Sequence, residues 1–173
     1  DEGMIGLLSI EDNIIVSHMD ELSNHSFLSA KKMHQVAENW VKKAGVKCFS
    51  IAERINQLSG GNAQKVVIAK WLNTDPKLFI LDGPTVGVDI GAKAEIHAIL
   101  RDLAQKGIGI IVISDDLPEL VQNCNKIIVM RDGKVEAAVD NSIDELSLSN
   151  LLIGASDAAK SAAQTTEQEV EEK

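Results

Sequence analysis

The sequence predicts an α/β fold built on a parallel sheet, because strand-like and helix-like segments alternate through its second half. Residues 78–81 form a continuous apolar run that ends at Asp82, and residues 108–113 and 127–130 form two further runs. Such runs are typical of strands buried on both faces of a parallel sheet. Residues 91–105 separate the first two runs and carry apolar side chains at helical spacing. We therefore expect strand–helix–strand units with right-handed crossovers.

The first third of the chain is predicted to be helical, with no strand. Residues 11–22 and 50–57 favour short helices, whereas the polar residues 23–29 favour a turn. Residues 30–44 place apolar side chains at helical spacing and predict a longer helix. The serine before this helix and the glycine after it are expected to cap its two ends.

The C-terminal segments carry their own turn and capping signals. Asp132-Gly133 joins two strand-like runs and predicts a tight hairpin turn. Ser142 and Glu145 match a capping box, which predicts a helix beginning at that serine. Residues 155–173 lack apolar periodicity, so we expect a disordered or weakly helical tail there.

Composition narrows the classes of function. Lys and Arg number 17 against 26 Asp and Glu, which gives a formal net charge of −9, and aromatic residues make up 3%. This composition disfavours a general nucleic-acid binder, because phosphate neutralisation requires a basic face and base stacking requires aromatic side chains. Cys48 and Cys124 have no Cys or His at metal-ligand spacing, so we expect two reduced thiols. No apolar run reaches the roughly 18 residues of a membrane span, so any membrane association is expected to be peripheral.

The segment Leu58-Ser59-Gly60-Gly61-Asn62 stands directly before a predicted helix at residues 63–72. Two glycines allow backbone amides to approach an anion closely, and a helix N-terminus adds free N–H groups and a positive dipole end. Alone, this pattern also fits an ordinary glycine-rich helix entry. Asp82 offers a second candidate, because ligands of α/β folds bind at the carboxyl ends of parallel strands. Alone, Asp82 also fits a turn-forming residue after a strand.

The order and spacing of three motifs resemble the ATP-binding-cassette (ABC) ATPases. Residues 58–62 resemble the ABC signature motif, residues 78–82 the Walker B strand and residues 86–89 the D-loop. Asn62, in place of the usual Gln, and residues 87–93 resemble one subgroup in particular. This subgroup is the second cassette of the fused ATPases of monosaccharide importers of the ribose, galactose, arabinose and xylose types.

The resemblance implies the C-terminal part of a P-loop NTPase (RecA-like) parallel-sheet core together with the ABC helical subdomain. It divides the chain into a helical subdomain at residues 1–57, the signature helix with the second half of the nucleotide-binding core at residues 58–154, and a tail at residues 155–173. It also implies that Asp82 holds Mg²⁺ through water and that Asp89 belongs to the D-loop. The signature residues would contact ATP in trans, on the nucleotide bound by another cassette: Ser59, Gly60, Gly61 and Asn62.

Three departures from the family pattern leave no complete catalytic set. The P-loop pattern Gly-x-x-x-x-Gly-Lys-Ser/Thr is absent. Gly83 stands where hydrolysing members carry the general-base Glu, and Asp115 stands where most members carry the switch His. The chain starts at Asp1 rather than Met, and by resemblance it starts after the Q-loop. We therefore expect a piece of a longer protein, with a degenerate nucleotide site of its own and no ATPase activity in isolation.

The function implied is that of an ATP-binding subunit of an ABC importer for a simple sugar, coupling ATP hydrolysis to transport. Its implied partners are membrane permease subunits, another ABC cassette and, indirectly, an extracellular or periplasmic sugar-binding protein, but no nucleic acid. Its implied location is peripheral, at the cytoplasmic face of the bacterial plasma membrane. The alternative is a non-transport or regulatory ABC-type module without catalytic activity. ABC proteins of translation or chromosome maintenance are disfavoured, because basic inserts and sustained heptads are lacking.

Overall fold

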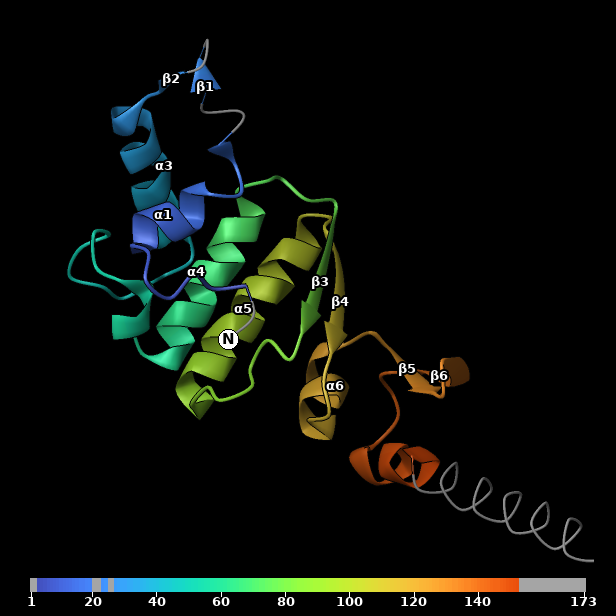
Figure 1. Cartoon of the computed structure of the whole chain (residues 1–173). Coiled ribbons are helices and arrows are strands. Elements are labelled where there is room, and N and C mark those ends of the chain that lie inside the picture. Colours follow the sequence, from blue (N-terminus) through green and yellow to red (C-terminus); the bar gives the residue numbers. More distant parts are fainter. Residues whose placement is uncertain (1–2, 20–22, 25–26, 153–173) are drawn as a thin grey trace, which may run out of the picture. The chain divides into compact units, whose positions relative to one another are not determined.

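The computed structural model describes residues 3–19, 23–24 and 27–152 of the 173-residue chain. The chain folds as two compact units, Asp1–Ile113 and Ser114–Lys173 (Figure 1). The predicted boundaries at residues 57 and 154 coincide with neither end of these units and stay predictions. Within the described residues, no helix is both long and apolar enough to cross a membrane.

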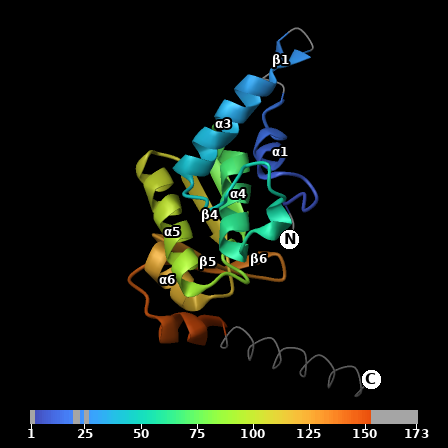
Figure 2. The ribbon, with the colours of Figure 1, turned by 90° about the vertical axis from the view of Figure 1, so that its left-hand side faces the viewer.

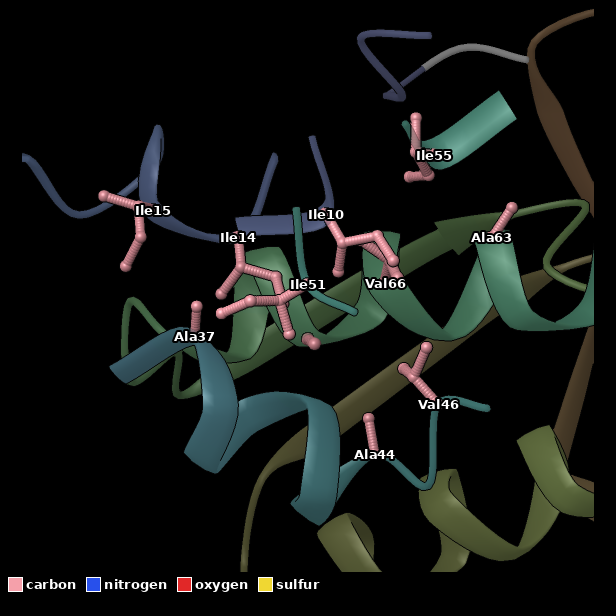
Figure 3. Packing of buried hydrophobic residues seen from close by; sticks show 11 residues of the cluster. Ile10, Ile14, Ile15, Ala37, Ala44, Val46, Ile51, Ile55, Ala63 and Val66 are labelled. Atoms are coloured by element: carbon pink, nitrogen blue, oxygen red, sulfur yellow. The ribbon is translucent and has the colours of Figure 1, made fainter. Parts of the chain in front are cut away.

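The first unit begins with helices packed around one apolar cluster. Ile10 and Ile14 are completely buried and lie beside Ala37 and Val66 in the space between three helices (Figure 3). The elements of this part are α1 (Ile10–Ile15), β1 (Ser23–Asn24), β2 (Phe27–Leu28), α3 (Ala30–Lys43), the 3₁₀-helix η1 (Ile55–Gln57) and α4 (Gly60–Leu72). Both α1 and α3 pack on α4, so this cluster supports the helix whose N-terminus carries the Ser-Gly-Gly segment (Figure 2).

Several predictions for this part are confirmed, and others are corrected. The Ser29 side chain caps α3 by accepting from the Lys32 backbone N–H, and Gly45 follows the helix with a φ of +62°. The polar segment after α1 contains the two short antiparallel strands β1 and β2 rather than a turn alone. The helix predicted over residues 11–22 ends at Ile15, and its residues 20–22 lie outside the described part of the chain.

A parallel strand–helix–strand unit completes the first compact unit. Strand β3 (Leu78–Asp82) pairs in parallel with β4 (Gly109–Ile113), and α5 (Ile90–Gln105) connects them. Phe79 and Leu81 are buried in a cluster with Ile96 and Leu100 of α5. The predicted α/β class with a parallel sheet is therefore confirmed.

The two-sided burial predicted for these strands is wrong for the described chain. Leu78 and Ile80 of β3 and Ile111 and Ile113 of β4 are all exposed on one face, because α5 covers only the opposite face. Alternating side chains of a strand point to opposite faces, so an apolar run cannot reveal from sequence whether one face or both are covered.

The second unit contains the hairpin predicted from Asp132-Gly133, but the parallel pairing also predicted for residues 127–130 is not found among the described residues. Its elements are α6 (Leu117–Asn123), β5 (Lys126–Arg131), β6 (Lys134–Asp140) and a helix over residues 145–152. Strand β5 pairs with β6, so among the described residues only β3 and β4 form a parallel pair. The turn between them is the predicted one, with positive φ at Asp132 and Gly133, as a type I′ turn requires.

The predicted capping box at the start of the last helix is displaced. Asp144, not Ser142, provides the cap, because its Oδ1 accepts a 2.9 Å hydrogen bond from the Ser147 backbone N–H. This bond, together with one from the Ser147 hydroxyl, holds the pKa of the Asp144 carboxyl below its ordinary value. The tail predicted at residues 155–173 lies outside the described residues.

Candidate functional site

The N-terminus of α4 is the first part of the candidate site. The helix begins at Gly60, so both glycines lie in its first turn rather than before it, with Ser59 as the N-cap residue. The first backbone N–H groups of a helix have no intrahelical acceptor. The Ser59 side chain does not accept from them, and both Ser59 and Gly60 are exposed. These donors are therefore placed to bind an anion.

The two glycines also allow two helices to meet. A Cβ at Gly61 would lie 2.3 Å from the Cβ of Ala92 on α5, and a Cβ at Gly60 would lie 3.3 Å from the Gly87 carbonyl oxygen. Any side chain at Gly61 would therefore force the start of α4 away from the start of α5. Reasoning from the sequence assigned these glycines to anion binding alone and missed this packing role.

Asp89 lies at the adjoining start of α5. Its Oδ1 accepts a 2.9 Å hydrogen bond from the Ala92 backbone N–H and so caps that helix. The turn before it bends at Gly87, whose φ is +72°. The structure thus brings Asp89 and the turn at Gly87 next to the Ser-Gly-Gly start of α4, where helices α4 and α5 lie side by side (Figure 2).

Asp82 and Gly83 lie at the carboxyl end of β3, before that turn. Asp82 is exposed, and the Gly83 N–H donates a 2.9 Å hydrogen bond to the Ile113 carbonyl oxygen. Gly83 has a φ of +55°, and a Cβ there would lie 3.0 Å from Cγ2 of Val86. This backbone conformation suits glycine and strains any other residue. The position that resembles the general-base Glu of ABC ATPases is therefore shaped here for glycine.

Asp115 belongs to the second compact unit, where it is exposed just before α6. The neighbouring Asp116 caps α6 by accepting from the Glu119 backbone N–H. The Ser114 hydroxyl also hydrogen-bonds the Glu119 carboxylate. The local structure therefore places Asp115 on a capped helix entry, with its carboxylate available to solvent.

An ion pair between the buried Lys65 and the exposed Glu95, behind the α4–α5 contact, was not predicted. Lys65 of α4 is 3% exposed, and its Nζ bonds both the Glu95 carboxylate of α5 and the Gly45 carbonyl oxygen. The Nζ of Lys47 lies 3.4 Å from the other oxygen of Glu95. The hydrogen bond from Lys65 and the charges of both lysines hold the pKa of the Glu95 carboxyl below its ordinary value. The available signal was a lysine among buried apolar residues of a helix, which requires a partner.

The donors present fit a nucleotide and a magnesium ion. The start of a 13-residue helix, where Ser59 and Gly60 are exposed, presents backbone N–H groups that suit phosphate oxygens. Among the described residues, no group of three or more His, Cys, Asp and Glu is placed to hold a metal. A single exposed carboxylate at Asp82 still suits Mg²⁺, which keeps several waters and takes its remaining ligands from phosphate.

A parallel strand–helix–strand unit with a Ser-Gly-Gly helix start and an aspartate at the strand end defines the α/β class of ATP-binding cassettes. A sequence profile of the ABC transporter family matches residues 3–86, and the chain belongs to this family.

Curated relatives in this family are named as sugar-import proteins. The chain is 42% identical to the ribose import ATP-binding protein RbsA of Halalkalibacterium halodurans, over 84% of this chain and 29% of that protein. It is also 42% identical to the xylose import ATP-binding protein XylG of Thermoanaerobacter pseudethanolicus, over 77% of this chain and 26% of that protein. The chain therefore spans less than a third of the length of these relatives.

Solved structures give the same fold. Two structures of the dimeric ATP-binding cassette MJ0796 match with TM-scores of 0.66 and 0.69 at 26% identity, over 80% of this chain and 59% of that one. The first is a post-hydrolysis state bound to ADP and Pi.

Proposed function

We propose that the chain is part of the ATP-binding component of an ABC importer for a simple sugar, and that its Ser-Gly-Gly segment acts on ATP bound by a partner cassette. The observation that carries this proposal is the exposed start of α4, where Ser59 and Gly60 leave backbone and hydroxyl donors available. The names of the relatives supply the substrate class, a monosaccharide such as ribose or xylose.

In this proposal some residues of the chain bind the phosphate or the magnesium ion, and others hold the phosphate-binding residues in position. The N–H groups of Gly60 and Gly61 and the hydroxyl of Ser59 donate to the terminal phosphate of ATP on the partner cassette. Such fixed donors stabilise the charge that develops as a phosphoryl group is transferred. Asp89 caps the start of α5, and the close approach of Gly61 to Ala92 sets α5 against α4 beside these donors. Asp82 would hold Mg²⁺ through water, and the ion would supply charge neutralisation at phosphate oxygens.

The chain's own nucleotide site is proposed to be degenerate. Gly83 has no group that accepts a proton, and loss of a general base typically costs about 10²–10⁴-fold in rate. Asp115 would place a carboxylate where most of the family has a histidine, and a carboxylate repels phosphate. Hydrolysis would then occur at one competent site, to which this chain contributes its Ser-Gly-Gly segment in trans.

The proposed partners follow from the same reading. A second cassette supplies the P-loop, and permease subunits couple the conformational change driven by ATP hydrolysis to transport. A sugar-binding protein delivers the substrate to the permease. The complex would place this chain peripherally at the cytoplasmic face of the bacterial plasma membrane.

Sugar uptake tests the proposal. A strain lacking the natural gene would be complemented with either the unchanged gene or the Ser59→Ala variant. Uptake of radiolabelled ribose, xylose and galactose would then be measured, with expression checked by immunoblot. We expect uptake of at least one sugar to be restored by the unchanged gene and lost with the variant. Restoration of no sugar by the unchanged gene would favour the regulatory alternative instead.

A further inference from the structure

We propose that Asn62 is a positioning residue that fixes the direction of the Ser59 hydroxyl and leaves the proton of that hydroxyl available to an anionic ligand. This inference rests on the proposed function, in which Ser59 donates to phosphate. It assigns Asn62 a role through Ser59 rather than direct contact with nucleotide.

The orientation of the Asn62 amide follows from its two partners. Its Oδ1 accepts a 2.9 Å hydrogen bond from the Lys47 backbone N–H, and its Nδ2 lies 3.0 Å from the Ser59 Oγ. A backbone N–H can only donate, so the side-chain atom facing Lys47 must be the oxygen. The amide nitrogen therefore faces Ser59.

This orientation decides what the serine hydroxyl can do. An amide NH₂ group can only donate, so the Ser59 Oγ is the acceptor in the Asn62–Ser59 hydrogen bond. The single hydroxyl proton of Ser59 must then be donated elsewhere. Ser59 is exposed and its side chain caps no backbone N–H of α4, so a ligand at the helix start can receive that proton. Donation from Asn62 also polarises the hydroxyl and strengthens its own donation.

The Lys47 backbone that orients Asn62 is itself held in place. The Lys47 Nζ lies 3.4 Å from one Glu95 oxygen, and the other Glu95 oxygen bonds the buried Lys65. The Lys65 Nζ also bonds the Gly45 carbonyl oxygen at 3.2 Å. Residues 45–47, which follow α3, therefore contact Glu95 of α5 and Lys65 of α4 through these charged groups. Asn62 is therefore oriented by the fold and not by the ligand.

Replacing the Asn62 amide by a carboxylate of nearly equal size tests this inference. In Asn62→Asp, one carboxylate oxygen keeps the bond from Lys47, and the other accepts the Ser59 proton and turns it away from the ligand. We expect kcat for ATP hydrolysis by the natural gene product, assembled with its partner cassette and permease, to fall about 10²-fold or more, the typical cost of losing one such donor. The thermal unfolding midpoint of the variant checks that its fold is kept.

The added charge is controlled in two ways. Gln64→Glu makes the same chemical change two positions along the helix, away from Ser59, and we expect kcat to change less than about threefold. Asn62→Asp is also combined with Ser59→Ala. If Asn62 acts through Ser59, the aspartate costs less than about threefold once the hydroxyl is absent, as expected for residues that act as a unit.

The outcomes separate this inference from the proposed function. Wild-type turnover in Ser59→Ala would overturn the proposed function itself. A large loss in Ser59→Ala with none in Asn62→Asp would overturn only the positioning role. An Asn62→Asp penalty that persists undiminished in the Ser59→Ala background would also overturn it, because Asn62 would then act on the ligand directly.

Discussion

Two regions of the first compact unit bear motifs of the same family but differ in construction. At the start of α4 and α5, a glycine permits contact between the helices, Asp89 caps one helix and Asn62 bridges Ser59 to Lys47. At the β3–β4 sheet, one apolar face is exposed and the strand-end turn passes through Gly83 in a left-handed conformation. The first region is complete in its own contacts, whereas the second presents one carboxylate, Asp82, beside a glycine. A motif that acts on another cassette's nucleotide needs only the kind of helix start found at α4 and α5, and no general base of its own.

The largest expected effect distinguishes the two faces of β3. Leu81 is 7% exposed and packs toward α5, whereas the adjacent Ile80 is 58% exposed. We expect Leu81→Ala to lower the free energy of unfolding of the chain by about 2–5 kcal/mol, from lost burial and the cavity left behind. Ile80→Ala should change it by less than about 0.5 kcal/mol. Urea unfolding followed by circular dichroism measures both, and equal losses would mean that the exposed face is covered in solution.

A smaller effect is expected at the contact between α4 and α5. Alanine favours a helix by about 1 kcal/mol over glycine, but the Cβ of Gly61→Ala would collide with Ala92. We expect a net destabilisation of about 1–3 kcal/mol, the usual cost of overpacking. The double variant Gly61→Ala with Ala92→Gly moves the methyl group to the other helix and should recover part of the loss. Thermal unfolding of the two variants and of the unchanged chain measures these effects, and a stabilised Gly61→Ala would contradict the close contact.

The smallest effect depends on pH. Because the folded-state pKa of Glu95 lies below its ordinary value, its charge stabilises the fold above the ordinary pKa of about 4.3, and this contribution is lost as the pH falls through the lowered pKa. We expect Glu95→Gln to unfold at a lower temperature than the unchanged chain at pH 7, with the difference shrinking below pH 4.3 or so. Asp102→Asn removes the carboxylate of the exposed Asp102–Lys106 pair and serves as the control, with little change at either pH. A pH-independent difference for Glu95→Gln would contradict the assigned charge interaction.

Much of this architecture could be predicted because its signals are local. The Ser29 cap, the positive φ after α3 and the turn at Asp132-Gly133 each depend on a few adjacent residues, and each was found where it was predicted. The family could be predicted because three short motifs occur in the expected order and at the expected spacing, and a sequence alone shows both.

The remaining features depend on contacts between distant segments. The apolar run at residues 127–130 was predicted to lie in the parallel sheet and to form a hairpin with the next strand, and among the described residues only the hairpin pairing with β6 is found. Likewise, Ser142 and Asp144 are both good caps, and only the position of the first helical turn selects Asp144. The Lys65–Glu95 pair joins residues far apart in sequence, so no local pattern predicts it. The nucleotide-binding roles of Ser59 and Asp82, and the loss of a general base at Gly83, stay predictions.

The most direct test of the central claim compares one residue from each region in the same assay. ATP hydrolysis by the natural gene product, with its partner cassette and permease, would be measured for Ser59→Ala and for Asp82→Asn. We expect Ser59→Ala to lower kcat by about 10²–10³-fold, as for loss of a preorganised donor to a reacting group. Asp82→Asn should leave kcat within about twofold, because the site beside Gly83 lacks a general base. Equal and large losses from the two substitutions would contradict the account, since both sites would then hydrolyse ATP.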